Sequence, residues 1–379
     1  MARPYGVYVH FPYCAHRCPY CEFAVTTRPV PASGRYARAV VAELEARAAP
    51  FDALQAVSLY LGGGTPSRWE PTEVAEVIAA VRGRCRLVAD AEVTIEANPE
   101  SCDRARLLAW RDAGVNRVSI GVQSFDPGVL AQLGRRHDGE SANRAIVTAA
   151  GVIPNVSVDL IYAGRRSSIP IAAADAARAV AAGAEHVSAY ALTLDPEALA
   201  EEVPLARARR TGRLTFPGDE EALAQARAIR AVLRRAGLRR YEVSNFARPG
   251  RESVHNRLYW DGESYLGVGA GAAGCRRSME GTVRWMNERD DRAWLAAVEA
   301  GRLPTATEDR FDAAADRAER LMLGLRTRRG VPLALVPRAR VGEVAALRKA
   351  RLAVVCGERL VLTSRGLDVQ SAVAERLMG

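Results

Sequence analysis

Apolar, β-branched segments alternate with helical patterns along the first half of the chain. Six short apolar runs predict strands, at residues 7–10, 57–61, 93–96, 117–121, 156–161 and 186–192. Apolar positions at helical spacing predict helices between them, near residues 34–48, 71–81, 103–113, 142–150 and 171–182. This alternation predicts βαβ units around a parallel sheet, and six units suit an α/β fold of the partial (β/α)6 barrel type.

The second half of the chain carries a different pattern. Residues 220–236 predict one amphipathic helix that packs on the barrel. Beyond it the pattern predicts helices and a hairpin, at residues 317–325, 341–350, 352–355, 360–363 and 364–377. We therefore predict a barrel domain over residues 1–300 and a helical, winged-helix-like module over residues 301–379. Since fold alone does not imply DNA binding, we expect this module to act as a lid or a protein-interaction surface.

Three cysteines lie close together on the loop predicted to leave the first strand. Cys14, Cys18 and Cys21 are separated by three and two residues. Thiolates suit iron–sulfur clusters or zinc. A 4Fe–4S cluster normally takes four cysteines, so three would leave one iron open to a further ligand. A zinc site is the alternative, with His10 or His16 as the fourth ligand.

Composition narrows the class of protein further. Seven cysteines, three of them clustered, suit a reducing compartment better than a disulfide framework. No signal peptide and no membrane-spanning run is visible, so we expect a cytoplasmic protein with at most peripheral membrane contact. The net charge of +9 comes from arginines spread along the chain, and we therefore predict no nucleic-acid partner.

Glycines and polar residues follow several of the predicted strands. Gly63 and Gly64 follow the second strand, and glycines there let the backbone approach a ligand and free its amide donors. Glu96 ends the third strand, Gln123 follows the fourth, and Asp159 stands among apolar residues of the fifth. Sites in such barrels form at the carboxyl ends of the strands. A tight turn for the glycines and a loop-fixing amide for Gln123 are the alternatives.

The cysteine spacing resembles that of radical S-adenosylmethionine (SAM) enzymes. With the other segments, it resembles the oxygen-independent coproporphyrinogen III dehydrogenase-like family, over roughly residues 5–287 and the C-terminal module. The resemblance implies a radical-SAM partial barrel whose 4Fe–4S cluster is held by Cys14, Cys18 and Cys21, with SAM on the open iron. Positions matched to the cluster-bound SAM are Tyr8, Gly63 and Glu96. Positions matched to a second SAM, whose binding is left open, are Tyr20, Gly64, Thr65, Gln123, Arg135 and Asp159.

Three features favour the haem-chaperone (HemW-type) branch of that family. The dehydrogenases carry a fourth cysteine two residues after the third and a longer N-terminal extension, whereas this chain has Phe23 at that position and its cysteine loop near the start. His255, Tyr259 and Trp260 match the His-Asn-x-x-Tyr-Trp motif of the branch. The match implies His255 as an axial haem ligand, with Tyr259 and Trp260 as flat faces for the porphyrin. Haem would then be the cargo and acceptor haemoproteins the partners, and we also consider a homodimer.

Two enzymatic alternatives stay open at this point. One is the dehydrogenase itself, an oxidative decarboxylase, which Phe23 argues against. The other is a HemN-like radical SAM methyltransferase. Ala163 begins a segment that reads Ala-Gly-Arg-Arg-Ser where the family usually continues Gly-Leu-Pro, and this change concerns the second SAM pocket. Whether the chain is an enzyme is therefore left open.

Overall fold

Six parallel strands form the centre of the larger sheet in the computed structural model, which describes residues 2–194 and 203–378. They are β1 (Pro4–Phe11), β2 (Gln55–Gly63), β3 (Glu92–Ala97), β4 (Arg117–Gln123), β5 (Asn155–Tyr162) and β6 (His186–Ala191). Each strand pairs in parallel with the next one along the chain. The predicted six-strand partial barrel is therefore confirmed.

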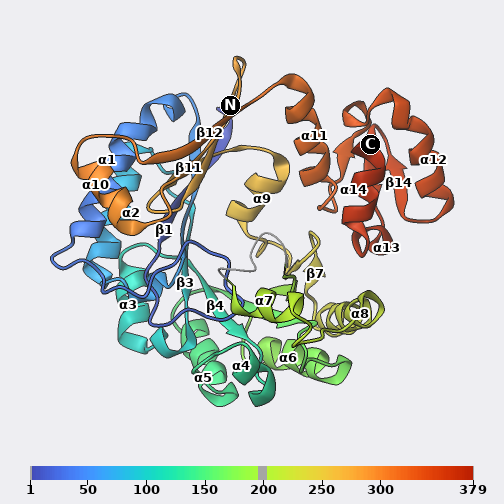
Figure 1. The fold of residues 1–379 in the computed structure, drawn as a ribbon, viewed down its shortest axis with the longest axis horizontal. Coiled ribbons are helices and arrows are strands. Elements are labelled where there is room, and N and C mark those ends of the chain that lie inside the picture. Colours follow the sequence, from blue (N-terminus) through green and yellow to red (C-terminus); the bar gives the residue numbers. More distant parts are fainter. Residues whose placement is uncertain (1, 195–202, 379) are drawn as a thin grey trace.

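Helices cover the outer face of these strands (Figure 1). They are α1 (Arg35–Ala48), α2 (Pro71–Arg84), α3 (Arg104–Asp112), α4 (Pro127–Gln132), α5 (Gly139–Ala150), α6 (Ile169–Ala181) and α8 (Asp219–Arg235). Four of them begin after a capping residue whose side chain accepts a backbone N–H of the first turn. The capping residues are Asp103, Asp126, Asp138 and Ser168. The pattern of apolar residues missed only the short α4 among them, because six residues are too few to show a period.

The sheet continues past both ends of the predicted barrel. Strand β9 (Ser264–Val268) pairs in parallel with the free edge of β1, and β10 (Ala273–Ser278), β11 (Gly281–Asn287) and β12 (Thr305–Phe311) follow in antiparallel order. Beyond β6 lie β8 (Asn245–Ala247) and β7 (Arg239–Arg240). Strand β12 belongs to this sheet, which therefore reaches Phe311, and the division into residues 1–300 and 301–379 stays a prediction.

A second, smaller core belongs to the C-terminal module. Its helices and strands are α11 (Ala313–Gly324), β13 (Val331–Pro332), α12 (Val341–Lys349), β14 (Ala353–Cys356), β15 (Arg359–Leu362), α13 (Ser364–Leu367) and α14 (Gln370–Met378). The strands pair in the order β13-β15-β14 around buried leucines from α11, α12 and α14. The predicted closing helix is two helices, interrupted at Asp368, whose carboxylate binds Arg230 and Arg240 of the barrel at 2.6 and 2.7 Å.

Three further helices complete the barrel domain, α7 (Pro204–Arg210), α9 (Val254–Asp261) and α10 (Asp291–Glu299). Figure 1 shows α9 at the centre of the molecule, between the sheet and the C-terminal module. Over the described part of the chain, no helix is both long enough and apolar enough to cross a membrane.

One buried carboxylate joins the added strands to the barrel. Glu43 of α1 accepts the backbone N–H of Gly269 at 2.9 Å and the indole N–H of Trp294 at 2.8 Å. Its other oxygen accepts from Arg47 at 2.7 Å and from Asn287 at 2.6 Å. A buried charge is tolerated only when hydrogen bonds satisfy it. Glu43 therefore needs all four donors, and Arg47 needs the carboxylate of Glu43.

We expect Glu43→Ala to lower the free energy of unfolding by about 3 to 5 kcal/mol, because it leaves Arg47 buried without its carboxylate. Urea unfolding followed by circular dichroism measures this. Glu45→Ala is the control on the same helix, since the Glu45 side chain is 57% exposed and should change stability by less than about 1 kcal/mol. Equal losses in the two variants would contradict the anchoring role of Glu43.

Candidate functional site

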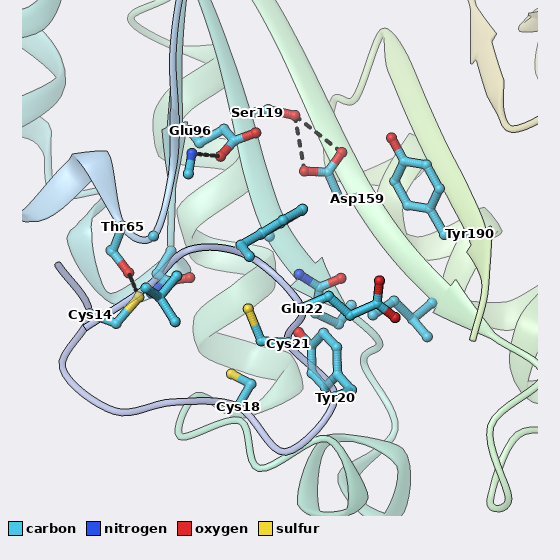
Figure 2. Close-up of a pocket in the computed structure, with 18 of the residues that line it drawn as sticks. Cys14, Cys18, Tyr20, Cys21, Glu22, Thr65, Glu96, Ser119, Asp159 and Tyr190 are labelled. Atoms are coloured by element: carbon cyan, nitrogen blue, oxygen red, sulfur yellow. Dashed lines mark hydrogen bonds between the residues drawn. The ribbon is translucent and has the colours of Figure 1, made fainter. Parts of the chain in front are cut away.

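A cavity of about 400 Å³ opens at the carboxyl ends of the parallel strands, beneath the cysteine loop (Figure 2). Because neighbouring strands run in parallel, the loops that follow them meet at this one edge of the sheet. All predicted cluster and SAM residues except Tyr8 line this cavity. They are Cys14, Cys18, Cys21, Tyr20, Gly63, Gly64, Thr65, Glu96, Gln123, Arg135 and Asp159.

The cysteine loop is closed at its neck by backbone hydrogen bonds. Cys14 donates its N–H to the carbonyl of Thr26 at 2.8 Å, so the chain leaves and rejoins β1 at one place. The Cys14 thiol lies 3.3 Å from the Thr65 hydroxyl, which donates to it. Figure 2 shows Cys18 and Cys21 farther along the same loop, facing the cavity.

All three thiols are free, and their surroundings keep protons on two of them. Burial raises the pKa of Cys14, and it raises the pKa of Cys21 to about 11. Binding of a metal must therefore release protons from these thiols. Three free thiols on one loop, facing one cavity, fit three of the four irons of a 4Fe–4S cluster, because each thiolate binds its own iron.

The histidines considered as zinc ligands have other partners. His10 donates from Nε2 to the carbonyl of Ala24 at 2.8 Å and accepts the hydroxyl of Tyr8 at Nδ1, at 3.0 Å. Both ring nitrogens of His10 are therefore engaged away from the cysteines. His16 Nε2 lies 3.0 Å from the carbonyl of Gly134 and 3.8 Å from the Cys18 thiol, so His16, unlike His10, stays beside the cysteines. Tyr8 donates to His10 and stacks on Tyr60, with 6.1 Å between the ring centres. Tyr60 lines the cavity and donates to Glu96, so Tyr8 lies one side chain behind the cavity wall.

Glu96 lies across the cavity from the cysteine loop (Figure 2). It accepts the hydroxyl of Tyr60 at 2.7 Å and the backbone N–H of Gly63 at 3.1 Å. Burial raises the pKa of Glu96 to about 7. Gly63 has φ +115°, and a Cβ there would meet the ring of His10 at 2.6 Å, so only glycine brings this amide to Glu96.

A second carboxylate lies deeper in the barrel. Asp159 accepts the hydroxyl of Ser119 at 3.0 and 3.1 Å, and burial raises the pKa of Asp159. Arg117 lines the inner end of the cavity, which we call its floor. Arg117 is 2% exposed, and its Nε has no hydrogen-bond partner in the described chain. Its nearest acidic oxygen, on Glu92, lies 3.8 Å from Nε. The cavity therefore combines two partly exposed carboxyl groups with one buried guanidinium.

Several residues that line the cavity were not predicted from the sequence. Arg117, Ser119, Ser188, Tyr190 and Asn256 all line the cavity. An arginine at the start of a buried parallel strand was the available signal for Arg117, since such a charge needs a reason to be inside. Asn256 belongs to the His-Asn-x-x-Tyr-Trp motif, but its place in the cavity could not be predicted, because only the fold brings α9 to the barrel.

Two residues at the rim of the cavity have constrained conformations, Arg135 through hydrogen bonds and Gln123 through its backbone. Arg135 donates from Nη2 to Asn98 and to the carbonyl of Gly121, both at 2.7 Å, and its Nη1 lies 3.8 Å from the Cys18 thiol. Gln123 has φ +67°, a conformation that is strained for a residue with a side chain and is typical of functional sites. Both features support a built site at the strand ends rather than loop-fixing contacts.

The altered segment after β5 carries local strain. Ala163 has φ +60°, where the family usually has glycine, and this conformation costs about 1 kcal/mol for alanine. Gln225 of α8 compensates by accepting the N–H of Ala163 at 2.9 Å and the hydroxyl of Ser167 at 2.7 Å. The segment thus keeps a glycine-like conformation without glycine.

The histidine of the predicted haem motif is buried away from the cavity. His255 is 1% exposed, with Nδ1 2.9 Å from the hydroxyl of Ser58 and Nε2 2.9 Å from that of Tyr259. Burial lowers the pKa of His255 to about 3, so the ring is neutral. The ring of Trp260 is covered by the guanidinium of Arg326, 4.4 Å from the ring centre. The structure brings the three motif residues together but leaves His255 no free nitrogen.

Comparison with known proteins identifies the family. Residues 8–168 match the Radical SAM superfamily. The chain is 39% identical to the haem chaperone HemW of Mycobacterium tuberculosis over 384 aligned positions, which cover 100% of this chain and 95% of the relative. The chain belongs to the HemW family of radical SAM proteins. Membership of the radical SAM superfamily implies a 4Fe–4S cluster and SAM.

Other relatives agree with this assignment. The haem chaperone HemW of Escherichia coli is 32% identical over 315 positions, covering 82% of this chain and 81% of the relative. The solved structure of Escherichia coli coproporphyrinogen III oxidase (HemN), a radical SAM enzyme, matches with a TM-score of 0.80 at 20% identity, over 99% of this chain and 90% of that chain. The second likeness shows that the HemW family member described here shares the HemN fold.

We expect Glu96→Gln to change how stability depends on pH. Between the ordinary pKa of 4.5 and the raised value of about 7, folded Glu96 binds a proton that the unfolded chain has lost. Wild-type stability should therefore fall, relative to the glutamine variant, by up to about 3 kcal/mol as the pH rises through this window.

Thermal unfolding of the metal-free protein between pH 5 and 8 measures this difference. Glu100→Gln is the control, because the side chain of Glu100 is 47% exposed. Parallel pH profiles for wild type and Glu96→Gln would show that Glu96 does not titrate in this range.

Proposed function

We propose that this protein is a cytoplasmic radical-SAM-type haem chaperone that binds haem and delivers it to acceptor haemoproteins. The observation that carries the proposal is the 39% identity with the haem chaperone HemW of Mycobacterium tuberculosis along the whole chain. The motif of His255, Tyr259 and Trp260 lies within that matched length and supports the haem part.

The cysteine loop would hold a 4Fe–4S cluster through Cys14, Cys18 and Cys21. A cluster with SAM supplies one-electron chemistry. The protein side of the site binds and orients: the hydroxyl of Thr65 donates to Cys14, and the guanidinium of Arg135 lies beside Cys18. These contacts stabilise thiolates in a buried loop, since donors and positive charge favour the anionic form.

The strand ends would bind the polar parts of SAM. Glu96 offers carboxylate oxygens to hydroxyl groups, and Gly63 sets the place of that carboxylate. Asp159 and Ser119 form a second acceptor group farther inside, where a cationic or hydroxyl-bearing ligand is favoured. With a pKa of about 7, Glu96 can lose its proton near neutral pH and then accept a hydrogen bond from a ligand hydroxyl.

An enzymatic role is the second candidate. The six positions matched to a second SAM all line the one cavity, and this observation favours a cavity that holds more than the cluster-bound ligand. Phe23 stands where the dehydrogenases carry a fourth cysteine, and its side chain is 62% exposed beside the cavity. Anaerobic turnover of coproporphyrinogen III, or methyl transfer from labelled SAM, would favour the enzymatic role over the chaperone.

We expect Cys14→Ser to abolish assembly of the cluster, because serine is a poor ligand for iron in such clusters. After anaerobic reconstitution, wild type should carry about four irons and four sulfides per chain, and the variant close to none. Cys356→Ser, at an exposed cysteine in the C-terminal module, should keep the full content. Equal iron in all three proteins would rule out the cysteine loop as the ligand set.

We expect His255→Ala to weaken haem binding at least about ten-fold, because loss of the axial ligand leaves only packing around the porphyrin. Visible absorption during haem titration of anaerobically reconstituted protein reports both affinity and ligation. His186→Ala is a matched control, since His186 is equally buried between Ser157 and Tyr241 and lies outside the motif. Unchanged haem affinity in His255→Ala would contradict the proposal that His255 is the axial haem ligand.

A further inference from the structure

The haem-motif helix α9 is enclosed on two sides (Figure 1). It contacts β1, β2 and β9 of the barrel, and it contacts α11 of the C-terminal module on the side away from the sheet. On the barrel side the ring of His255 is packed so closely that a Cβ on Gly6 would lie 2.9 Å from it. A porphyrin can therefore reach His255 only if α9 moves outward, toward the module.

The inner end of α9 is fixed by one carboxylate. Glu92 accepts the backbone N–H groups of Val254 and His255, both at 3.0 Å, and the hydroxyl of Ser253 at 3.3 Å. A carboxylate at a helix N-terminus is favoured by the exposed amide donors and by the helix dipole. These buried bonds define the seated position of the helix.

The outer end of α9 is fixed by two arginines that directly follow α11. Arg329 binds the carboxylate of Asp261 at 2.6 Å, and the guanidinium of Arg326 lies over the ring of Trp260 at 4.4 Å. These contacts are partly solvent-exposed, with 58% of the Arg329 side chain accessible, so each is individually weak. Gly262, with φ +70°, follows the helix directly and supplies a joint at this end.

We propose that the C-terminal module is a latch on the haem-motif helix. Arg326 and Arg329 hold α9 seated, so that His255 stays covered, and haem reaches His255 only after these two contacts open. The inference rests on the proposed function, in which His255 is the haem ligand. It assigns the module a regulatory role, because the contacts of the module with α9 set how readily haem is loaded and released.

The decisive variant is Arg329→Glu, which replaces attraction to Asp261 by repulsion at an exposed position. In the metal-free protein, we expect diethyl pyrocarbonate to modify His255 about five-fold faster than in wild type, read by mass spectrometry of its peptide. Haem should also associate with the reconstituted variant about five-fold faster. Hydrogen exchange of the amides of residues 254–262 gives a second measure of the same opening.

Two further proteins make the test specific. Arg310→Glu reverses an arginine that is 77% exposed and paired with Glu308 at 2.8 Å on β12, and it should leave both rates unchanged. Combining Arg329→Glu with Asp261→Arg restores opposite charges and should return both rates to the wild-type values.

Equal modification and exchange rates in wild type and Arg329→Glu would overturn the latch, whatever haem does. The latch would also fall if Arg310→Glu had the same effect. Faster modification without haem binding to any of these proteins would support the latch and overturn the proposed haem ligand instead. Failure of the latch and failure of the haem site therefore give different results.

Discussion

Parallel pairing of consecutive strands is the constraint on which the rest of this structure depends. When β1 to β6 pair in order and in parallel, their carboxyl ends must lie along one edge. Segments separated by more than a hundred residues then meet there: the cysteine loop after β1, the glycines after β2, and the polar ends of β3 to β6. The cavity is a consequence of this pairing, and its chemistry is decided by which residues end each strand.

Buried polar groups define the other end of the barrel. Glu92 joins the start of β3 to the N-terminus of α9, and Arg117 lies 3.8 Å from it under the cavity. The rings of His186 and His255 are each held between a serine and a tyrosine. The carboxylate of Glu92 and the two histidine rings are tolerated inside the protein because each has hydrogen-bond partners, and the partners of Glu92 and His255 require one position of α9. The helix that carries the haem motif is thereby part of the barrel itself.

This arrangement places the cysteine loop and the haem-motif histidine on opposite sides of the cavity floor. The cysteine loop and the predicted SAM residues face the cavity, whereas His255 lies behind its floor and only Asn256 of the motif lines it. The C-terminal module contacts the haem motif through Arg326 and Arg329 and contacts the barrel through Asp368. In the proposed function the protein must both hold and release haem, and a covered histidine on a helix held by weak outer contacts suits that requirement.

The sequence by itself determined the six parallel strands, most of their helices, the cysteine loop and the family, because these depend on local periodicity and on short motifs. It also determined that Gly63, Glu96 and Asp159 fall at strand positions that share one edge. Only the tertiary structure decided that β9 to β12 extend the sheet, since the pairing of β9 with β1, which attaches all four strands, joins segments about 260 residues apart and leaves no local signal. Only the tertiary structure decided that Arg117 and Asn256 line the cavity, that Tyr8 lies one side chain behind its wall, and that His255 is covered. The side of a strand or helix that is buried is set by what packs against it.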